Sequence, residues 1–127
     1  MHAYNTKKQA RREAAKFEFF ERLDEFGGVL KDQSVGNQAL IAIRDGHDYI
    51  YPAFQFVDVE RLPYLDEILE LLGNVSAEAQ CTFFLNPMGF DDGMEELPYV
   101  VLRDGSTEKQ LNAIKREASL FMSPTPA

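Results

Sequence analysis

A dense aromatic stretch at residues 45–56 constrains the fold more than any other feature of the chain. It reads Asp-Gly-His-Asp-Tyr-Ile-Tyr-Pro-Ala-Phe-Gln-Phe and places four aromatic rings within eight residues. Each ring can bury about 150 Å² or more, so rings at this density are typical of the packing centre of a small domain. The Asp45-Gly46 pair is a hairpin signal between two apolar runs, and it predicts a β-hairpin over residues 39–51.

We expect the second half of this stretch to be scaffold rather than an active site. Pro52 lacks an N–H and ends regular pairing after the return strand at residues 49–51. The aromatic side chains should hold the hairpin against the rest of the fold, and the glutamine amide should bind a backbone group. The residues with this structural role are Tyr51, Pro52, Phe54, Gln55 and Phe56.

Helix signals occupy most of the remaining chain. A long N-terminal helix is expected over residues 6–26, ended by Gly27-Gly28, with a loop or one short helical turn over 29–38. After the hairpin and a short connection at 57–62, a Pro63-led helix closes at Gly73. Further helices are expected at 77–85, after the N-cap Ser76, and at 99–103. A capping box at Thr107 and Gln110 opens the last helix, at 108–121.

These elements predict a mainly α fold with a small β-hairpin. In chain order we expect a long N-terminal helix, the hairpin and a compact bundle of about four helices. Residues 1–26 form the helix with a basic first half, 27–121 the main domain, and 122–127 an extended tail. Residues 87–96 are expected to be an acidic loop, and the whole should form one folded unit.

Charge is unevenly distributed along the chain. The net charge is −8, and residues 27–127 carry seven Lys or Arg against sixteen Asp or Glu. A body this acidic repels phosphate and disfavours nucleic acid, so a basic protein partner fits better. The N-terminal segment differs, because it holds a cluster of cations: Lys7, Lys8, Arg11, Arg12 and Lys16. This cluster is either a solvated helix end or the arm of a DNA-associated regulator.

The residues that usually carry catalysis do not form a recognisable pattern. The single cysteine, Cys81, excludes an internal disulfide, and the expected place for its thiol is a buried, inert position. His2 and His47 are far apart, and Asp91-Asp92-Gly93 lacks the remaining oxygen ligands of a calcium loop. We therefore expect no enzyme activity, no catalytic residue, no cofactor and no metal. With no apolar run typical of a signal peptide or a bilayer span, the expected location is the cytoplasm.

Several motifs together carry a family resemblance. The hexamer Tyr51-Pro52-Ala53-Phe54-Gln55-Phe56 is followed by Leu62-Pro63-Tyr64-Leu65 and Ile68-Leu69, by Phe83-Phe84-Leu85-Asn86-Pro87, and by the run from Pro98 to Gly105. In this order they resemble the toxin-binding domain of the bacterial Xre/MbcA/ParS antitoxins. The similarity covers about residues 39–121. The hexamer is its most specific part, and the rest is order and spacing.

The resemblance implies a protein partner in a toxin–antitoxin system. Antitoxins of this family bind RES-type toxins, which attack NAD, and in several the C-terminal segment blocks the toxin's active site. Carried over, residues 121–127 are the candidate plug, although a terminal segment of this kind also frays in many proteins. The implied partner-binding residues are Phe121, Met122, Ser123, Pro124 and Thr125.

The acidic loop offers a second contact surface and keeps another function open. Phe90, Asp91 and Asp92 are the natural contacts there for a basic protein, including in a stand-alone interaction module of a mobile element. Many relatives also carry a helix-turn-helix before the hexamer, but the ten residues at 29–38 are too few for that unit, so repression of an operon is in doubt. A homodimer is left open.

Overall fold

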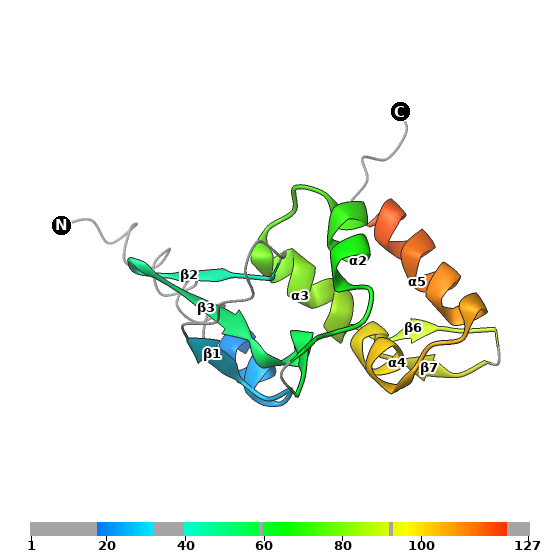
Figure 1. The fold of residues 1–127 in the computed structure, drawn as a ribbon, viewed down its shortest axis with the longest axis horizontal. Helices are drawn as coiled ribbons and strands as arrows, with labels where there is room; N and C mark the ends of the chain where they lie inside the picture. Colours follow the sequence, from blue (N-terminus) through cyan, green and yellow to red (C-terminus); the bar gives the residue numbers. More distant parts are fainter. Residues whose placement is uncertain (1–17, 32–39, 59, 92, 122–127) are drawn as a thin grey trace, which may run out of the picture.

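A computed structural model describes residues 18–31, 40–58, 60–91 and 93–121 (Figure 1). Residues 18–24 are helical. The remaining elements, in chain order, are β1 (Val29–Lys31), β2 (Ile43–Asp45), β3 (Asp48–Pro52), the 3₁₀ turn η1 (Ala53–Gln55), β4 (Phe56–Val57), β5 (Glu60–Arg61), α2 (Leu65–Leu72), α3 (Ala77–Leu85), β6 (Met88–Gly89), β7 (Glu95–Glu96), α4 (Pro98–Asp104) and α5 (Glu108–Leu120).

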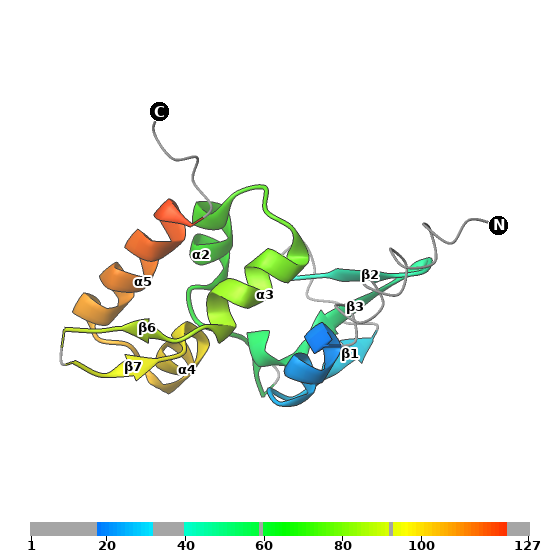
Figure 2. The ribbon, with the colours of Figure 1, turned by 180° about the vertical axis from the view of Figure 1, so that it is seen from behind.

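The strands of the described residues form three small antiparallel sheets. The largest has the order β1-β3-β2, with Leu30 opposite Tyr51 and Arg44 opposite Tyr49. β4 pairs with β5, and β6 pairs with β7. The β2–β3 hairpin and the β6–β7 hairpin lie toward opposite ends of the long axis, and α5 lies at the β6–β7 end (Figures 1 and 2).

The expected fold class, mainly α with one small hairpin and a bundle of about four helices, is therefore wrong. β1 occupies residues 29–31, where a loop or helical turn was expected, and the connection at 57–62 and the loop at 87–96 each contain paired strands. These strands are two or three residues long, too short to show a period-2 pattern. Of the long N-terminal helix, only residues 18–24 are described as helical, and residues 6–17 lie outside the described part.

Individual helices with strong local signals follow the predictions closely. The Ser76 hydroxyl accepts a hydrogen bond from the Ala79 N–H at 3.1 Å and begins α3 at the expected residue. The capping box that opens α5 is confirmed, with both of its hydrogen bonds made. α2 begins at Leu65, later than Pro63 suggested, because Tyr64 has a left-handed φ of 64° that no helical residue adopts.

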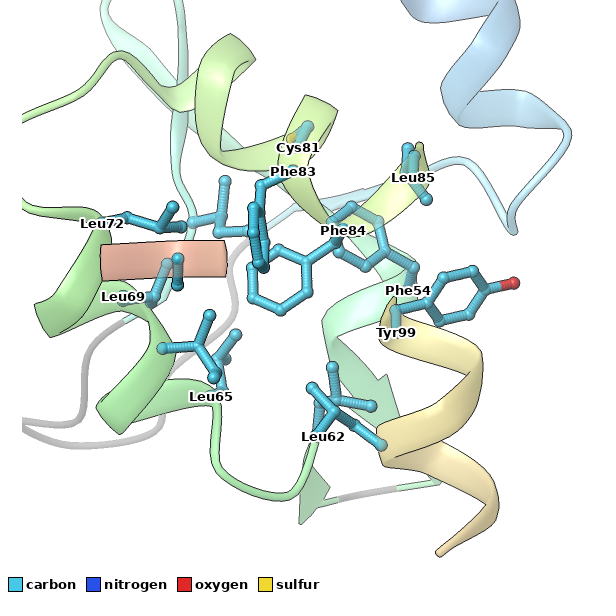
Figure 3. Packing of buried hydrophobic residues seen from close by; sticks show 14 of the residues in the cluster. Phe54, Leu62, Leu65, Leu69, Leu72, Cys81, Phe83, Phe84, Leu85 and Tyr99 are labelled. Carbon is cyan, nitrogen blue, oxygen red and sulfur yellow. The ribbon is translucent and has the colours of Figure 1, made fainter. Parts of the chain in front are cut away.

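Of the four rings in the aromatic stretch, only Phe54 is buried in the core, whereas Tyr51 and Phe56 are partly buried and Tyr49 is exposed, so the expected packing centre is confirmed for Phe54 alone. The Phe54 ring lies 5.8 Å from Phe84 and 5.5 Å from Tyr99, so it connects the sheet to α3 and α4 (Figure 3). Ile114 and Ala118 of α5 are fully buried, and α5 packs against α2. The hairpin is confirmed at β2 and β3, with Gly46 at a φ of 66° in its turn.

Gln55 is a buried polar side chain within this apolar core. Its Oε1 accepts a hydrogen bond from the Ile41 N–H at 2.7 Å, and its Nε2 donates to the Ile41 carbonyl at 2.8 Å and to the Pro52 carbonyl at 3.1 Å. Its side chain is fully buried. The amide thus pairs with both polar groups of Ile41, just before β2, as a neighbouring strand would. The expected bond from Gln55 to the backbone is confirmed.

The helical residues 18–24 are fixed to the core from two sides. Leu23 is 1 % exposed, and the Arg22 guanidinium donates to the Leu85 carbonyl at 2.5 Å and to Asn86 Oδ1 at 3.1 Å. Arg22 therefore satisfies a carbonyl at the C-terminal end of α3, where helices leave carbonyls without intrahelical partners.

Candidate partner-binding surface

One face of α5 carries the residues that line two pockets. Gln110, Ala113, Glu117 and Phe121 follow one another at spacings of three and four, which places them on one side of a helix. At about 1.5 Å per residue, this face is about 16 Å long. The segment at residues 86–91 lies opposite and lines both pockets too. We call this face of α5, together with residues 86–91 and 93–96, the α5 surface.

The larger pocket lies between the first half of α5 and the β6–β7 turn. Its volume is about 420 Å³, and its lining residues are Gly89, Phe90, Asp91, Thr107, Lys109, Gln110 and Ala113. Lys109 Nζ and Asp91 Oδ2 form an ion pair of 2.8 Å at the surface. The hydrogen bond from Lys109 lowers the pKa of Asp91 from its ordinary value. Phe90 is partly buried against the core.

The smaller pocket lies at the other end of the same face. Its volume is about 140 Å³, and it is lined by Thr82, Phe83, Asn86, Pro87, Met88, Pro98, Glu117 and Phe121. The Phe121 ring meets the Phe83 ring edge to face, with centroids 5.4 Å apart and an interplanar angle of 75°. This contact fixes the position at which the chain leaves α5.

The β6–β7 turn, which supplies Phe90 and Asp91 to the larger pocket, also carries exposed groups. The Phe90 N–H donates to the Met94 carbonyl at 2.9 Å, which closes the turn. Met94 is 64 % exposed, and Asp91, Glu95 and Glu96 are exposed beside it. An apolar side chain therefore stands in an acidic surrounding.

The structure places Phe90 and Asp91 at the larger pocket and Phe121 at the smaller one, at opposite ends of the same face. Phe90, Asp91 and Phe121 all lie on the α5 surface, although Phe121 is a packed helix end rather than part of a free tail. Other partner-binding candidates lie outside the described residues: Asp92, Met122, Ser123, Pro124 and Thr125. So do the candidate nucleic-acid contacts Lys7, Lys8, Arg11, Arg12 and Lys16.

Part of the hexamer lies in the core, and none of its residues lines these pockets. Pro52, Phe54 and Gln55 are buried, and Tyr51 and Phe56 are partly buried. Sequence reasoning missed Gln110, Ala113 and Glu117 as surface-forming residues. Their helical spacing was a usable signal, but the opposite wall of the pockets becomes visible only in the tertiary structure.

Reactive groups in the described part of the chain are few. Cys81 is fully buried, and burial, with a smaller contribution from Glu78, raises the pKa of its thiol to about 12. The expected buried position of this thiol is confirmed. The described residues contain no group of three His, Cys, Asp or Glu side chains placed to hold a metal ion. Within the same residues, no helix combines the length and the apolar character that crossing a membrane requires.

Comparison with known proteins adds no relative. No family model, curated protein or solved structure matches this chain. The resemblance to the Xre/MbcA/ParS antitoxins therefore depends on the motifs quoted above.

Proposed function

We propose that this chain is an antitoxin-like binding protein that neutralises a RES-type toxin by direct contact. The identity of the partner comes from the resemblance carried by the hexamer and the motifs after it. The observation that supports the binding role is that three candidates line pockets along one face of α5, Phe90 and Asp91 at the larger pocket and Phe121 at the smaller one. These residues were candidates on sequence grounds and are separated by up to 31 positions.

The composition of the α5 surface supports a protein partner. Protein interfaces typically have an apolar or aromatic centre that excludes water and a polar rim around it. Partly buried Phe90 and Phe121 and exposed Met94 supply apolar contact, and Asp91, Glu95, Glu96 and Glu117 supply the rim.

The net charge of −8 supports a basic contact region on the partner. Opposite charge accelerates association and discourages wrong partners, while the apolar contacts slow dissociation. We therefore expect the rate of complex formation to fall as salt is added.

The proposed route to neutralisation uses the chain that follows α5. Phe121 anchors that chain beside Phe83. Residues 122–127 can reach at most about 20 Å from this anchor when extended. In the proposal, the α5 surface binds the toxin and residues 122–127 enter its NAD site.

Co-expression with a RES-type toxin tests the proposal, and the gene adjacent to that of this chain is the first place to look for one. The toxin alone should stop growth and deplete NAD, and the full chain should restore both and co-purify with the toxin. Deleting residues 122–127 should leave the complex intact but abolish protection. If the full chain neither binds the toxin nor restores NAD, the proposed function is wrong.

A matched pair of charge reversals tests the surface itself. Asp91→Arg changes an exposed residue at the larger pocket, and Glu70→Arg makes the same change on exposed Glu70 of α2. We expect Asp91→Arg to weaken toxin binding about tenfold, in the range of a moderate interface contact, and Glu70→Arg to change it less than twofold. Equal effects would show that general charge, rather than the α5 surface, governs binding.

A further inference from the structure

The smaller pocket of the α5 surface combines an apolar lining with a single carboxylate. Five of its eight lining residues are apolar, Thr82 and Asn86 are polar, and exposed Glu117 is the acidic one; the apolar five are Phe83, Pro87, Met88, Pro98 and Phe121. Its volume of about 140 Å³ is well below the roughly 300–1,000 Å³ of sites for small-molecule ligands. The pocket therefore suits one side chain rather than a metabolite.

The charges around this pocket leave Glu117 available. Among the described lining residues none is basic. Within the described part of the chain, Glu117 takes part in no ion pair. Of the nearby cations, Lys115 pairs with Glu67 at 2.6 Å, Arg22 donates to the neutral oxygens of Leu85 and Asn86, and Arg116 is exposed. A carboxylate that loses water on binding needs an opposite charge, because an unpaired charge is costly to desolvate.

We propose that this pocket binds a lysine or arginine side chain of the protein partner. The proposal rests on the proposed function and specifies which group of the partner enters the surface. The aliphatic stem of such a residue lies on Met88 and the prolines, and its charged end meets Glu117 and the aromatic rings. A purely apolar side chain would fill the space but leave Glu117 without a counter-charge.

The following segment of the chain cannot supply this cation. Residues 122–127 read Met-Ser-Pro-Thr-Pro-Ala and contain no Lys or Arg. We assign the pocket to a second protein because residues 27–127 are strongly acidic and favour a basic partner. If replacing the chain's own cations at residues 7–16 removed the counter-charge of Glu117, this assignment would be overturned.

A short peptide probe tests the pocket without the toxin. The full chain, labelled with ¹⁵N, is titrated with acetyl-Gly-Arg-Gly-amide and with the same peptide carrying citrulline, which keeps the shape but lacks the charge. The arginine peptide should shift the amide signals of Phe83, Met88, Glu117 and Phe121 with a dissociation constant on the order of millimolar. The citrulline peptide should bind at least about fivefold more weakly. Equal binding, or shifts at other residues only, would overturn the proposal.

Two variants separate the pocket from general charge. Glu117→Gln should weaken the arginine peptide about tenfold, and Glu70→Gln, an equal loss of charge on α2, should leave it within twofold. Both positions are exposed, so a far-UV circular dichroism spectrum is enough to verify folding. Unchanged peptide binding in Glu117→Gln would overturn the assignment. If the chain self-associates and this self-association disappears in Glu117→Gln, the pocket binds a second copy of the chain. That result would also overturn the assignment to a protein partner.

The same variants distinguish this inference from the proposed function. If the toxin binds but Glu117→Gln leaves its affinity unchanged, the pocket assignment fails and the antitoxin role stands. If the arginine peptide binds at Glu117 but no RES-type toxin forms a complex, the antitoxin role fails and the pocket stands as a site for another basic protein.

Discussion

Replacing Gln55 by methionine should destabilise the fold far more than its single amide suggests. Methionine has a similar length and volume, so the change leaves no large cavity. It removes the partner of the Ile41 N–H and of the Ile41 carbonyl, and one donor to the Pro52 carbonyl, which also accepts a backbone bond within η1. Gln55 is fully buried, so water cannot take over these bonds without opening the core.

The magnitude follows from the number of groups left without a partner. A buried donor or acceptor that loses its partner costs about 1–3 kcal/mol, and removing the glutamine's own buried amide offsets part of this. We expect a net loss of about 3 kcal/mol, a large share of the roughly 5–15 kcal/mol that stabilises a typical domain. With a urea dependence of about 1.5 kcal/mol per molar, the unfolding midpoint should fall by about 2 M.

Urea unfolding followed by circular dichroism measures this change, because the chain has no tryptophan for fluorescence. Hydrogen exchange adds a local readout, since the Ile41 amide should lose its protection. The control is Gln80→Met, the same chemical change at a partly exposed position of α3, with an expected effect within about 0.5 kcal/mol. If Gln55→Met is as stable as this control and the Ile41 amide stays protected, the reasoning about the buried amide is refuted.

Three further predictions concern the other polar contacts. Arg22→Met removes the two hydrogen bonds at the end of α3 and should cost about 1 kcal/mol in urea unfolding. Arg116→Met, on the exposed side of α5, should cost less than half as much, and equal losses would contradict the capping role. The thiol of Cys81, whose pKa is raised to about 12, should react with Ellman's reagent at pH 8 only after unfolding. Rapid reaction in the native protein would contradict the burial of the thiol. Because the pKa of Cys81 is higher in the folded protein than in the unfolded chain, the free energy of unfolding should fall as the pH rises above about 9. The pKa of Asp91, lowered from 3.8, should return toward that value in Lys109→Met when followed by NMR. The stabilisation from the ion pair is fully present above the ordinary pKa of 3.8 and is lost as the pH falls through the lowered pKa of Asp91. An unchanged pKa of Asp91 in Lys109→Met would exclude the ion pair as the cause.

Local sequence signals determined most of the helix boundaries. Ser76 and Thr107 each offer a side-chain oxygen to the first turn of a helix, and both begin one where expected. The prolines at 87 and 98 and the glycines at 73 and 105 lie at or near helix ends. These signals work because a helix closes its hydrogen bonds within a few residues, so its ends depend mainly on adjacent side chains. The Asp45-Gly46 turn is equally local and equally predictable.

The tertiary structure alone decided the short strands and the candidate surface. The pairs β4–β5 and β6–β7 have two residues in each strand, and β1 gains its partner from β3 about 20 positions later. No periodicity can report a strand of that length, because its hydrogen bonds depend on which segments the core brings side by side. The aromatic stretch shows the same division between local signals and tertiary packing. The sequence alone determined that Gln55 should bind backbone, but only the packed core decided that its partner is Ile41. Likewise, helical spacing determined that Glu117 and Phe121 share a face of α5, while the position of residues 86–91 decided that this face lines a pocket.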